Sequence, residues 1–275
     1  MKTLAIPFIK RDYCLDLFME QIKKQTYPKD KLYLLFVDNS KDILYGTRLR
    51  HIFSEIKDDY ADSKFITLNF DSFDHSDYSP TIDCRLAKHR AVVAVMKEIY
   101  KESKGDLFIV EDDTLIPLNA LEKLNAVCIV CKDAVAACGY SFYWHKGWKG
   151  RPNVWEFKME GIKGGEEGVK ELEWKMVPTS GIREGVESIG ASGTGCILLK
   201  REFLDSGYEP KEIVDTLGFK GQDIHVGYWI NVKMRKRLYV DWSIRCPHIH
   251  KDTDGKIDVI GANVVIEDGK LVPTW

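Results

Sequence analysis

Short apolar runs alternate with single amphipathic segments through the first half of this chain, and this alternation constrains the fold more than any other feature. The apolar runs are residues 3–8, 32–37, 65–70 and 107–110. The segment 86–100, between the last two runs, carries apolar residues at helical spacing. Strands joined by single helices form right-handed βαβ units around a parallel sheet. We therefore expect an α/β fold with a mostly parallel central sheet flanked by helices.

The second half of the chain follows a different pattern. Residues 143–180 are rich in tryptophan, glycine and charge, which predicts a hairpin or loop excursion over the sheet. Residues 196–199 return to an apolar strand, and residues 257–271 predict a small hairpin with turn chemistry at Glu267-Asp268-Gly269. No low-complexity linker divides the chain, so we expect a single domain over residues 1–275.

Composition excludes several classes of function. The 275 residues are 44% hydrophobic, and the formal net charge of −2 gives no general attraction to nucleic acid or anionic lipid. No segment approaches the ~18 apolar residues of a membrane span, and Pro7 breaks the short apolar start, so we expect neither a transmembrane segment nor a signal peptide. The seven cysteines are scattered. Cys128 and Cys131 lack the second pair that a zinc site needs, so we expect free thiols in a reducing cytoplasm, with a redox or metal pair as the alternative.

Three consecutive acids, Glu111-Asp112-Asp113, directly follow the apolar run 107–110. Ligands of open α/β sheets gather at the carboxyl ends of parallel strands. Three carboxylates in a dry site repel one another unless a cation lies among them, and oxygen ligands suit Mg²⁺ or Mn²⁺. The alternative is a solvated turn that caps the next helix, since Thr114 and Pro117 follow.

Several further motifs occur in an order that resembles a GT-A-fold glycosyltransferase, most like family 2. The segments that carry the resemblance are 4–11, Gln25-Thr-Tyr-Pro28 with 34–40, 84–90, 108–117, 193–203, Gly221-Gln-Asp223 and 238–249. The resemblance implies a Rossmann-like GT-A sheet, with a nucleotide-binding half at about 1–115, an acceptor-binding half at about 116–250 and a C-terminal extension over 251–275. The implied activity is hexosyl or pentosyl transfer from a nucleotide sugar.

The resemblance also implies a divalent metal, Mn²⁺ or Mg²⁺. Glu111, Asp113 and His248 are its implied ligands, with His250 as the competing histidine, and Asp112 would face the ribose or a metal-bound water. Glu111 stands where the family usually has Asp. A surface histidine pair is the alternative interpretation of positions 248 and 250.

For the donor nucleotide, the resemblance points to Pro7 in a nucleotide-facing loop and to Asp38 as a hydrogen-bond acceptor for the base, which favours uracil and a UDP-sugar. Arg85 or Arg90 would pair with phosphate. The alternatives are an ordinary strand-end turn for Asp38 and a helix surface for the two arginines.

Asp223 is the implied catalytic base of a single, inverting displacement, because it matches the acid of the family's Gly-Glu-Asp motif. Its neighbour Gln222 replaces the usual Glu and, with Trp144 and Trp148, is expected to contact the acceptor. The alternatives are an N-cap for Asp223, whose helix we expect over 224–232, and core packing for the tryptophans.

Three other functions stay open at this point. One is a glycosyltransferase whose acceptor is a hydroxylated base in DNA, in place of a saccharide or other hydroxyl, with phosphates tracked by the basic side chains of 233–237. A solvated helix end also explains those cations. The others are a nucleotidyltransferase, although residues 8–13 lack its glycine-rich basic signature, and a catalytically silent sugar- or nucleotide-binding module.

Overall fold

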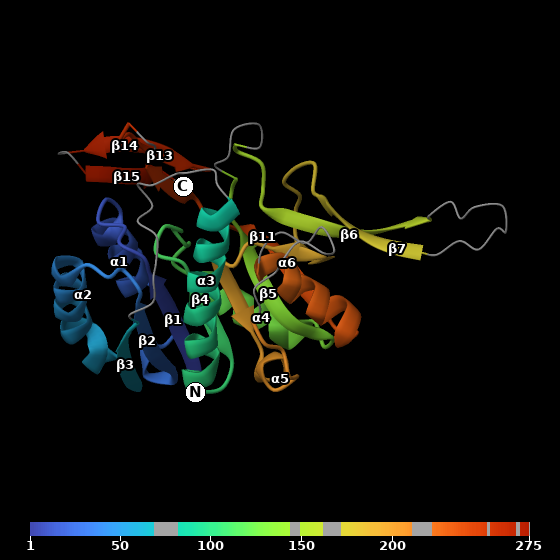
Figure 1. Cartoon of the computed structure of the whole chain (residues 1–275), viewed down its shortest axis with the longest axis horizontal. Helices are drawn as coiled ribbons and strands as arrows, with labels where there is room; N and C mark the ends of the chain where they lie inside the picture. Colours follow the sequence, from blue (N-terminus) through green and yellow to red (C-terminus); the bar gives the residue numbers. More distant parts are fainter. Residues whose placement is uncertain are drawn as a thin grey trace.

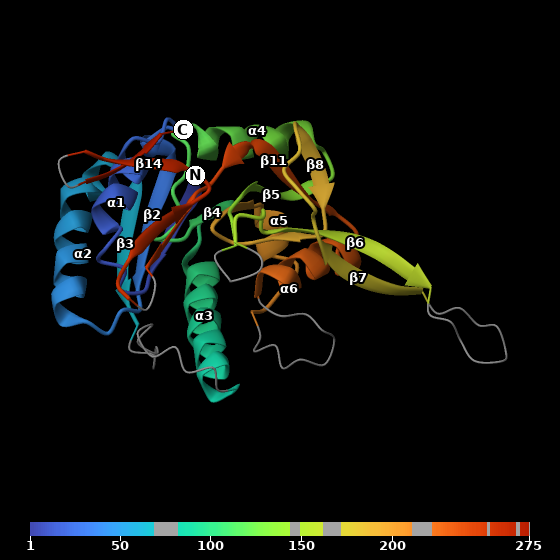
Figure 2. The same cartoon turned by 90° about the horizontal axis from the view of Figure 1, so that it is seen from above.

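The computed structural model describes residues 1–68, 82–143, 149–161, 172–210, 222–251, 254–267 and 270–274. They form an α/β fold around an eight-stranded sheet of order β3-β2-β1-β4-β10-β5-β11-β8 (Figures 1 and 2). The predicted mostly parallel sheet is confirmed: β1–β2, β2–β3, β1–β4 and β5–β11 pair in parallel. The antiparallel pairs involve β10, which lies between β4 and β5, and the edge strand β8.

The first half builds the parallel part of the sheet through βαβ units. Its elements are β1 (Lys2–Phe8), α1 (Leu15–Lys23), η1 (Lys29–Lys31), β2 (Leu32–Asp38), α2 (Ile43–Ile56), η2 (Lys57–Asp59), β3 (Asp62–Thr67), α3 (Ile82–Glu102) and β4 (Leu107–Val110). Every residue of β2 and β4 is buried, as the continuous apolar runs predict for strands covered on both faces.

The second half completes the sheet and adds smaller β structures. Its elements are α4 (Ala120–Val130), β5 (Ala134–Tyr140), β6 (Val154–Gly161), β7 (Leu172–Pro178), β8 (Val186–Ile189), β9 (Ala191–Ser192), β10 (Cys196–Leu199), α5 (Arg201–Leu204), α6 (Gln222–Tyr228), the π-helical η3 (Trp229–Lys233), β11 (Arg237–Arg245), β12 (His248–Lys251), β13 (Ile257–Ile260), β14 (Asn263–Glu267) and β15 (Lys270–Thr274). The predicted excursion contains the β6–β7 hairpin, which projects away from the sheet in Figure 1.

The tail differs from its prediction in one respect. We expected one hairpin over 257–271, whereas β13 pairs with β12 and a separate hairpin is formed by β14 and β15. The split occurs because Gly261 adopts a φ of +98°, a left-handed conformation that breaks the run between β13 and β14.

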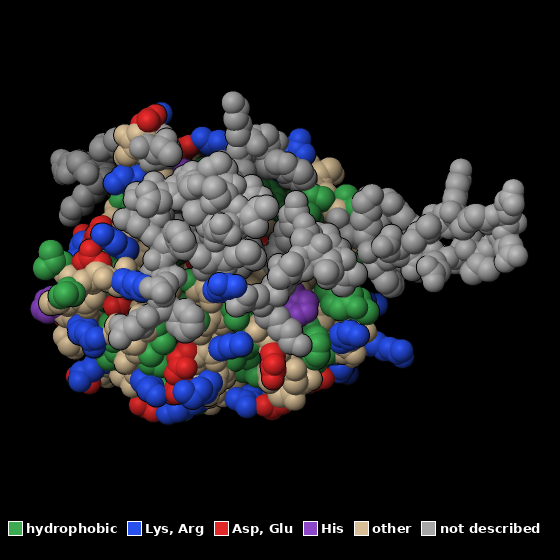
Figure 3. Space-filling model, in the orientation of Figure 1, with side chains coloured by type: hydrophobic (Ala, Val, Ile, Leu, Met, Phe, Trp, Pro, Cys, Tyr) green, Lys and Arg blue, Asp and Glu red, His purple; other side chains and the backbone are tan. Residues whose placement is uncertain are grey.

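Helices cover both faces of the sheet, as Figure 2 shows. Alternate residues of β1 point to opposite faces: Leu4, Ile6 and Phe8 pack with α1, α2 and α4, and Ala5 packs with the cluster that includes α3, α5 and α6. Two hydrophobic cores therefore sandwich the sheet. None of the helices in the described part of the chain is long and apolar enough to cross a bilayer. Acidic and basic side chains are interspersed over the described surface in Figure 3.

Candidate active site

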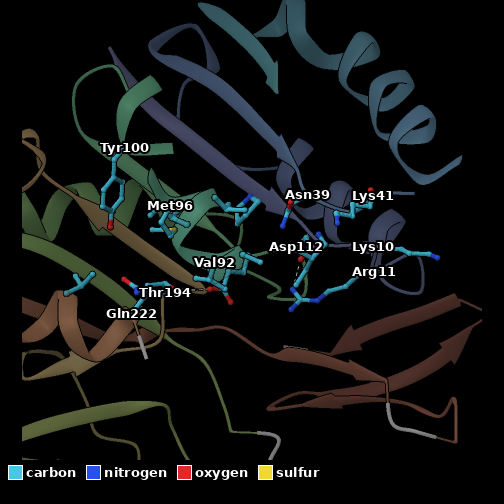
Figure 4. A pocket seen from close by; sticks show the side chains of 18 of the residues that line it. Lys10, Arg11, Asn39, Lys41, Val92, Met96, Tyr100, Asp112, Thr194 and Gln222 are labelled. Atoms are coloured by element: carbon cyan, nitrogen blue, oxygen red, sulfur yellow. Dashed lines mark hydrogen bonds and ion pairs between the residues drawn. The ribbon is translucent and has the colours of Figure 1, made fainter. Parts of the chain in front are cut away.

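A cavity of about 500 Å³ opens at the carboxyl ends of β1, β2 and β4 (Figure 4). Its polar side comes from the loops that follow these strands, and its apolar side from the inner face of α3 and from α6. The lining residues are Pro7, Ile9, Lys10, Arg11, Asn39, Ser40, Lys41, Asp42, Ala91, Val92, Val95, Met96, Tyr100, Ile109, Glu111, Asp112, Thr194, Tyr208, Gln222 and Val226. Of the predicted site residues, Pro7, Glu111, Asp112 and Gln222 thus lie in its wall.

Asp112 ties the end of β4 to the loop after β1. Its side chain is buried, and its Oδ2 accepts a hydrogen bond of 3.1 Å from the backbone N–H of Ile9. Its Oδ1 lies 2.5 Å from Nη1 of Arg11. Lys10, with a φ of +50°, forms the sharp turn immediately before Arg11. Burial raises the pKa of Asp112 to about 6, although the charge of Arg11 opposes that shift.

Asp113 joins three separate segments of the chain. Its Oδ2 lies 2.9 Å from Nη2 of Arg11 and 2.6 Å from Nε2 of His248. Its carbonyl accepts a 2.8 Å hydrogen bond from the N–H of Ile249, which fixes the start of β12 against the acidic triplet. Burial acts to raise the pKa of Asp113, but the charges of Arg11 and His248 hold it below its usual range.

Glu111 is held by the turn before β10. The hydroxyl of Thr194 donates to its Oε1 at 2.6 Å, and its own N–H donates to the carbonyl of Gly195 at 3.1 Å. A Cβ on Gly195 would lie 2.7 Å from Oγ1 of Thr114, so only glycine permits this approach. Burial raises the pKa of Glu111, and the nearby charge of Asp113 raises it further.

Asp223 lies in the first turn of α6. Its Oδ1 accepts a 3.0 Å hydrogen bond from the N–H of Ile224. Burial raises its pKa to about 6, and the charge of Glu111 contributes to the increase. The two carboxyl groups are therefore close enough to interact. The helix already includes Gln222, so Asp223 is not the N-cap residue that we weighed as its alternative role.

Packing of α6 against the strand end at 189–191 places Asp223. A Cβ on Gly227 would lie 2.1 Å from the carbonyl oxygen of Gly190, so the helix approaches this backbone as closely as glycine allows. The amide of Asn231 donates to the carbonyls of Ile189, Gly190 and Gly227 at 2.9 to 3.2 Å. These contacts hold the helix that carries Gln222 and Asp223.

Two tyrosines, Tyr100 and Tyr208, line the cavity. The hydroxyl of Tyr208 donates to Oε1 of Gln222 at 3.3 Å. Burial raises the pKa of Tyr208 and of Tyr143, and the charge of Asp223 adds to both increases. The hydroxyl of Tyr100 lines the same cavity and has no hydrogen-bond partner among the described residues.

Several predicted site residues lie elsewhere. Asp38 is buried, and its Oδ1 accepts from the N–H of Ser40 at 2.9 Å, so its carboxylate shapes the loop after β2 and is not part of the cavity wall. Arg90 is exposed on α3 and is likewise outside the wall, as are both predicted histidines. Trp144, Trp148 and the side chain of Arg85 are outside the described residues.

Sequence reasoning missed Arg11, which contacts two acids of the triplet. The resemblance points to Arg85 or Arg90 for phosphate binding, and residue 11 only ends the segment 4–11. Sequence reasoning also missed Thr194 and Tyr208 in the cavity wall. No local signal marks these three residues, because their site contacts are made with residues far along the chain.

The acidic triplet and His248 offer atom types that bind divalent metals. Carboxylate oxygens of Asp113 and Glu111 and the imidazole of His248 are ordinary ligands for Mn²⁺. In the described part of the chain, however, no three His, Cys, Asp or Glu side chains converge on one point. Glu111 is bonded to Thr194, and the cation at Asp113 is the guanidinium of Arg11.

Comparison with known proteins identifies the fold. No protein-family profile and no curated protein matches the sequence. Among solved structures, the mannosyltransferase PcManGT of Pyrobaculum calidifontis, in complex with GDP-Man and Mn²⁺, matches 89% of this chain and 55% of its own at 14% identity and a TM-score of 0.55. GalNAc-T7, solved with UDP, GalNAc and Mn²⁺, matches 90% of this chain and 43% of its own at 12% identity and a TM-score of 0.57.

A third match is residues 1–349 of S. aureus TarS in complex with UDP-GlcNAc. It covers 89% of this chain and 58% of its own at 15% identity and a TM-score of 0.50. This chain therefore spans about half the length of each of these three structures. These likenesses confirm the predicted GT-A-type fold, and at such identities they extend to the fold alone.

Proposed function

We propose that this GT-A-fold chain is a metal-dependent glycosyltransferase that moves a sugar from a nucleoside diphosphate to an acceptor hydroxyl. One observation carries the proposal: the cavity at the ends of β1, β2 and β4 has Glu111 and Asp112 in its wall, and the carboxyl of Asp223 lies near enough to sense Glu111. The acids of the proposed donor site and the candidate base are thus near each other, although Asp223 itself is not among the residues of the cavity wall.

The donor nucleotide is assigned to the polar side of the cavity. Pro7, Asn39 and Ser40 line the part next to β1 and β2, where they can contact the nucleoside. Lys10, Lys41 and Arg11 bring positive charge to the same wall, which suits a diphosphate. We infer a UDP-sugar as donor from the family resemblance; the matched structures include complexes with both UDP- and GDP-sugars.

Mn²⁺ or Mg²⁺ is the proposed cofactor, and Asp113, His248 and Glu111 are the residues that would hold it. A divalent cation supplies Lewis-acid stabilisation of the leaving diphosphate. Asp113 and His248 are already in contact, whereas Glu111 is directed toward Thr194. Asp112 keeps the loop after β1 in place through Ile9.

Asp223 is the proposed base, which removes the proton of the acceptor hydroxyl as the sugar is transferred with inversion. A carboxylate with a pKa of about 6 is mostly ionised at neutral pH and is more basic than an ordinary aspartate. Gln222 and Tyr208 form a hydrogen-bonded pair beside it that can orient the acceptor. Trp144 and Trp148 stay predicted acceptor contacts.

A saccharide or other small hydroxyl acceptor is favoured over DNA. Arg235 and Arg237 of the basic run line a separate hollow of about 690 Å³ beside β8. Glu156 and Glu187 line the same hollow, where both pair with Arg183. The run therefore does not extend the donor cavity into a track for phosphates.

The test is a thermal-shift panel of nucleoside diphosphates and nucleotide sugars, each with and without Mn²⁺. A ligand that binds only the folded state raises the melting temperature by mass action. We expect a metal-dependent increase with one nucleotide and its loss in Asp113→Ala. A folded protein that no nucleotide stabilises would contradict the donor-site assignment. Release of nucleoside diphosphate in the presence of candidate acceptors then tests the transfer itself.

A further inference from the structure

Arg11 occupies a special place in the acidic triplet. Its two terminal nitrogens contact two different carboxylates, Nη1 with Asp112 at 2.5 Å and Nη2 with Asp113 at 2.9 Å. The Arg11 side chain is 17% exposed, and those of Asp112 and Asp113 are 1% and 5% exposed. Figure 4 shows the guanidinium beside Asp112 at the edge of the cavity.

A guanidinium suits this position better than any other protein cation. It is planar and permanently charged, and its fork of N–H donors can bond two carboxylates at once. Adjacent buried carboxylates repel each other strongly, so a cation between them is needed for the ionised site to be stable. Burial acts to lower the pKa of Arg11, but the charges of Asp113 and Asp112 raise it above its usual range.

The contacts of Asp113 show what this means for a metal. Its Oδ2 receives both Nη2 of Arg11 and Nε2 of His248. This is the oxygen beside the histidine that would complete a metal site, and it already has a cationic partner. A divalent ion bound between this oxygen and His248 would lie against the guanidinium, and their positive charges repel each other.

We propose that Arg11 is the built-in counter-cation of the acidic triplet and that a divalent metal binds only by displacing it from Asp113. The inference rests on the proposed function solely in assigning the metal to Asp113. The displaced guanidinium still lines the cavity, where a diphosphate can accept its hydrogen bonds. Arg11 thus acts as a positioning residue that keeps metal affinity low until a nucleotide is present.

The test measures binding of Mn²⁺ alone, without nucleotide, to the full chain by calorimetry and by the loss of the free-ion EPR signal. We expect Arg11→Met to bind Mn²⁺ at least tenfold more tightly than the original protein. Arg48→Met is the matched control, because Arg48 pairs with Asp12 and Asp16 at the surface. It should leave the Mn²⁺ affinity unchanged. Asp113→Asn in the Arg11→Met background should abolish the gain.

Stability provides a second readout. Arg11→Met should lower the melting temperature without metal, because it leaves buried carboxylates without their cation. Saturating Mn²⁺ should then raise the melting temperature of the variant by more degrees than that of the original protein. If Arg11→Met does not fold, Arg11→Lys replaces it, since one ammonium cannot bridge both carboxylates in the same geometry.

Three outcomes would overturn the inference. They are equal or weaker Mn²⁺ binding in the folded Arg11 variant, a gain in affinity that survives Asp113→Asn, and no Mn²⁺ binding in either protein. The last would also remove the metal from the proposed function. Thermal shifts measured with the nucleotides in the absence of Mn²⁺ test the donor cavity separately.

Discussion

Nε2 of His248 lies 2.6 Å from Oδ2 of Asp113, although the two residues are 135 positions apart in the sequence. The contact joins the start of β12 to the end of β4, and the N–H of Ile249 reinforces it through the carbonyl of Asp113. Of the two histidines in the predicted pair, His248 is therefore the one that contacts the acidic triplet.

Replacing His248 should affect metal binding and stability together. His248→Ala removes a half-buried partner of a buried, ionised carboxylate, and we expect a loss of ~1–3 kcal/mol in the free energy of unfolding by urea titration. Metal-dependent binding of nucleotide should weaken about 10-fold or more. His250→Ala is the matched control in the same strand, and an equal effect of that change on nucleotide binding would contradict the assignment.

The pKa of Asp223 sets the pH below which we expect activity to fall. Because its pKa is raised to about 6 and a base must be ionised, kcat/KM should fall tenfold per pH unit below about pH 6. Asp223→Asn should lower kcat about 10²- to 10⁴-fold while nucleotide binding is retained. Initial rates from pH 4.5 to 8 measure both effects. A variant that keeps the original rate would show that the base lies elsewhere.

The carboxyl of Asp223 should lower the free energy of unfolding at neutral pH. Its pKa is higher in the folded protein than in the unfolded chain, so its contribution is favourable at low pH and is lost as the pH rises from about 4 through about 6. Asp223→Asn should therefore raise the free energy of unfolding by ~2–3 kcal/mol at pH 7.5 and leave it nearly unchanged at pH 4. Denaturant titrations at the two pH values provide the comparison.

Thr194 should stabilise the ionised form of Glu111. Thr194→Val keeps the shape of the side chain but removes the donor at 2.6 Å, so the pKa of Glu111 should rise further. We expect a loss of ~1–3 kcal/mol in the free energy of unfolding at pH 7.5 and a smaller loss at acidic pH. Thr194→Ser retains the hydroxyl and should restore most of it. Equal losses in both variants would assign the effect to packing.

A substitution at Gly227 tests whether the contact between α6 and the backbone at 190 and 191 positions the proposed base, Asp223. A methyl group there would lie 2.1 Å from the Gly190 oxygen and 2.6 Å from Cβ of Ala191. Gly227→Ala should lower the free energy of unfolding by ~1–3 kcal/mol, and kcat should fall because α6 must shift. Gly181→Ala, which meets no atom within 4 Å, is the control. If Gly227→Ala is destabilised but keeps the original kcat, the contact stabilises the fold and does not position the base.

The parallel half of the fold was predictable because its signals are local. The runs that became β1, β2 and β4 are continuous and apolar, and the position of Glu111-Asp112-Asp113 at a strand end follows from the boundary of β4. The order of the sheet was not predictable in the same way. β10 was expected as a strand, but its antiparallel place between β4 and β5 depends on pairing partners distant in the sequence.

The site shows the same division between local and distant contacts. Asp38 accepts at its Oδ1 a hydrogen bond from the N–H of Ser40, two residues away, as a strand-end aspartate does when it closes its own turn, and its contact with the base stays a prediction. Arg11 was missed because its partner Asp112 is 101 positions away. A motif specifies which residue types are present, whereas the charge balance of a buried cluster is decided by whichever side chains the fold brings together.

The place of β10 has a consequence for how the protein is made. β4 is synthesised well before the strand that covers its outer edge, so the nascent N-terminal half presents an unpaired row of backbone groups until β10 emerges. The acidic triplet at the tip of β4 receives Thr194 together with β10 and His248 only later, and contacts between residues so far apart in the sequence form slowly. A truncated product that stops after β4 would retain an open, apolar sheet edge and would be prone to aggregate.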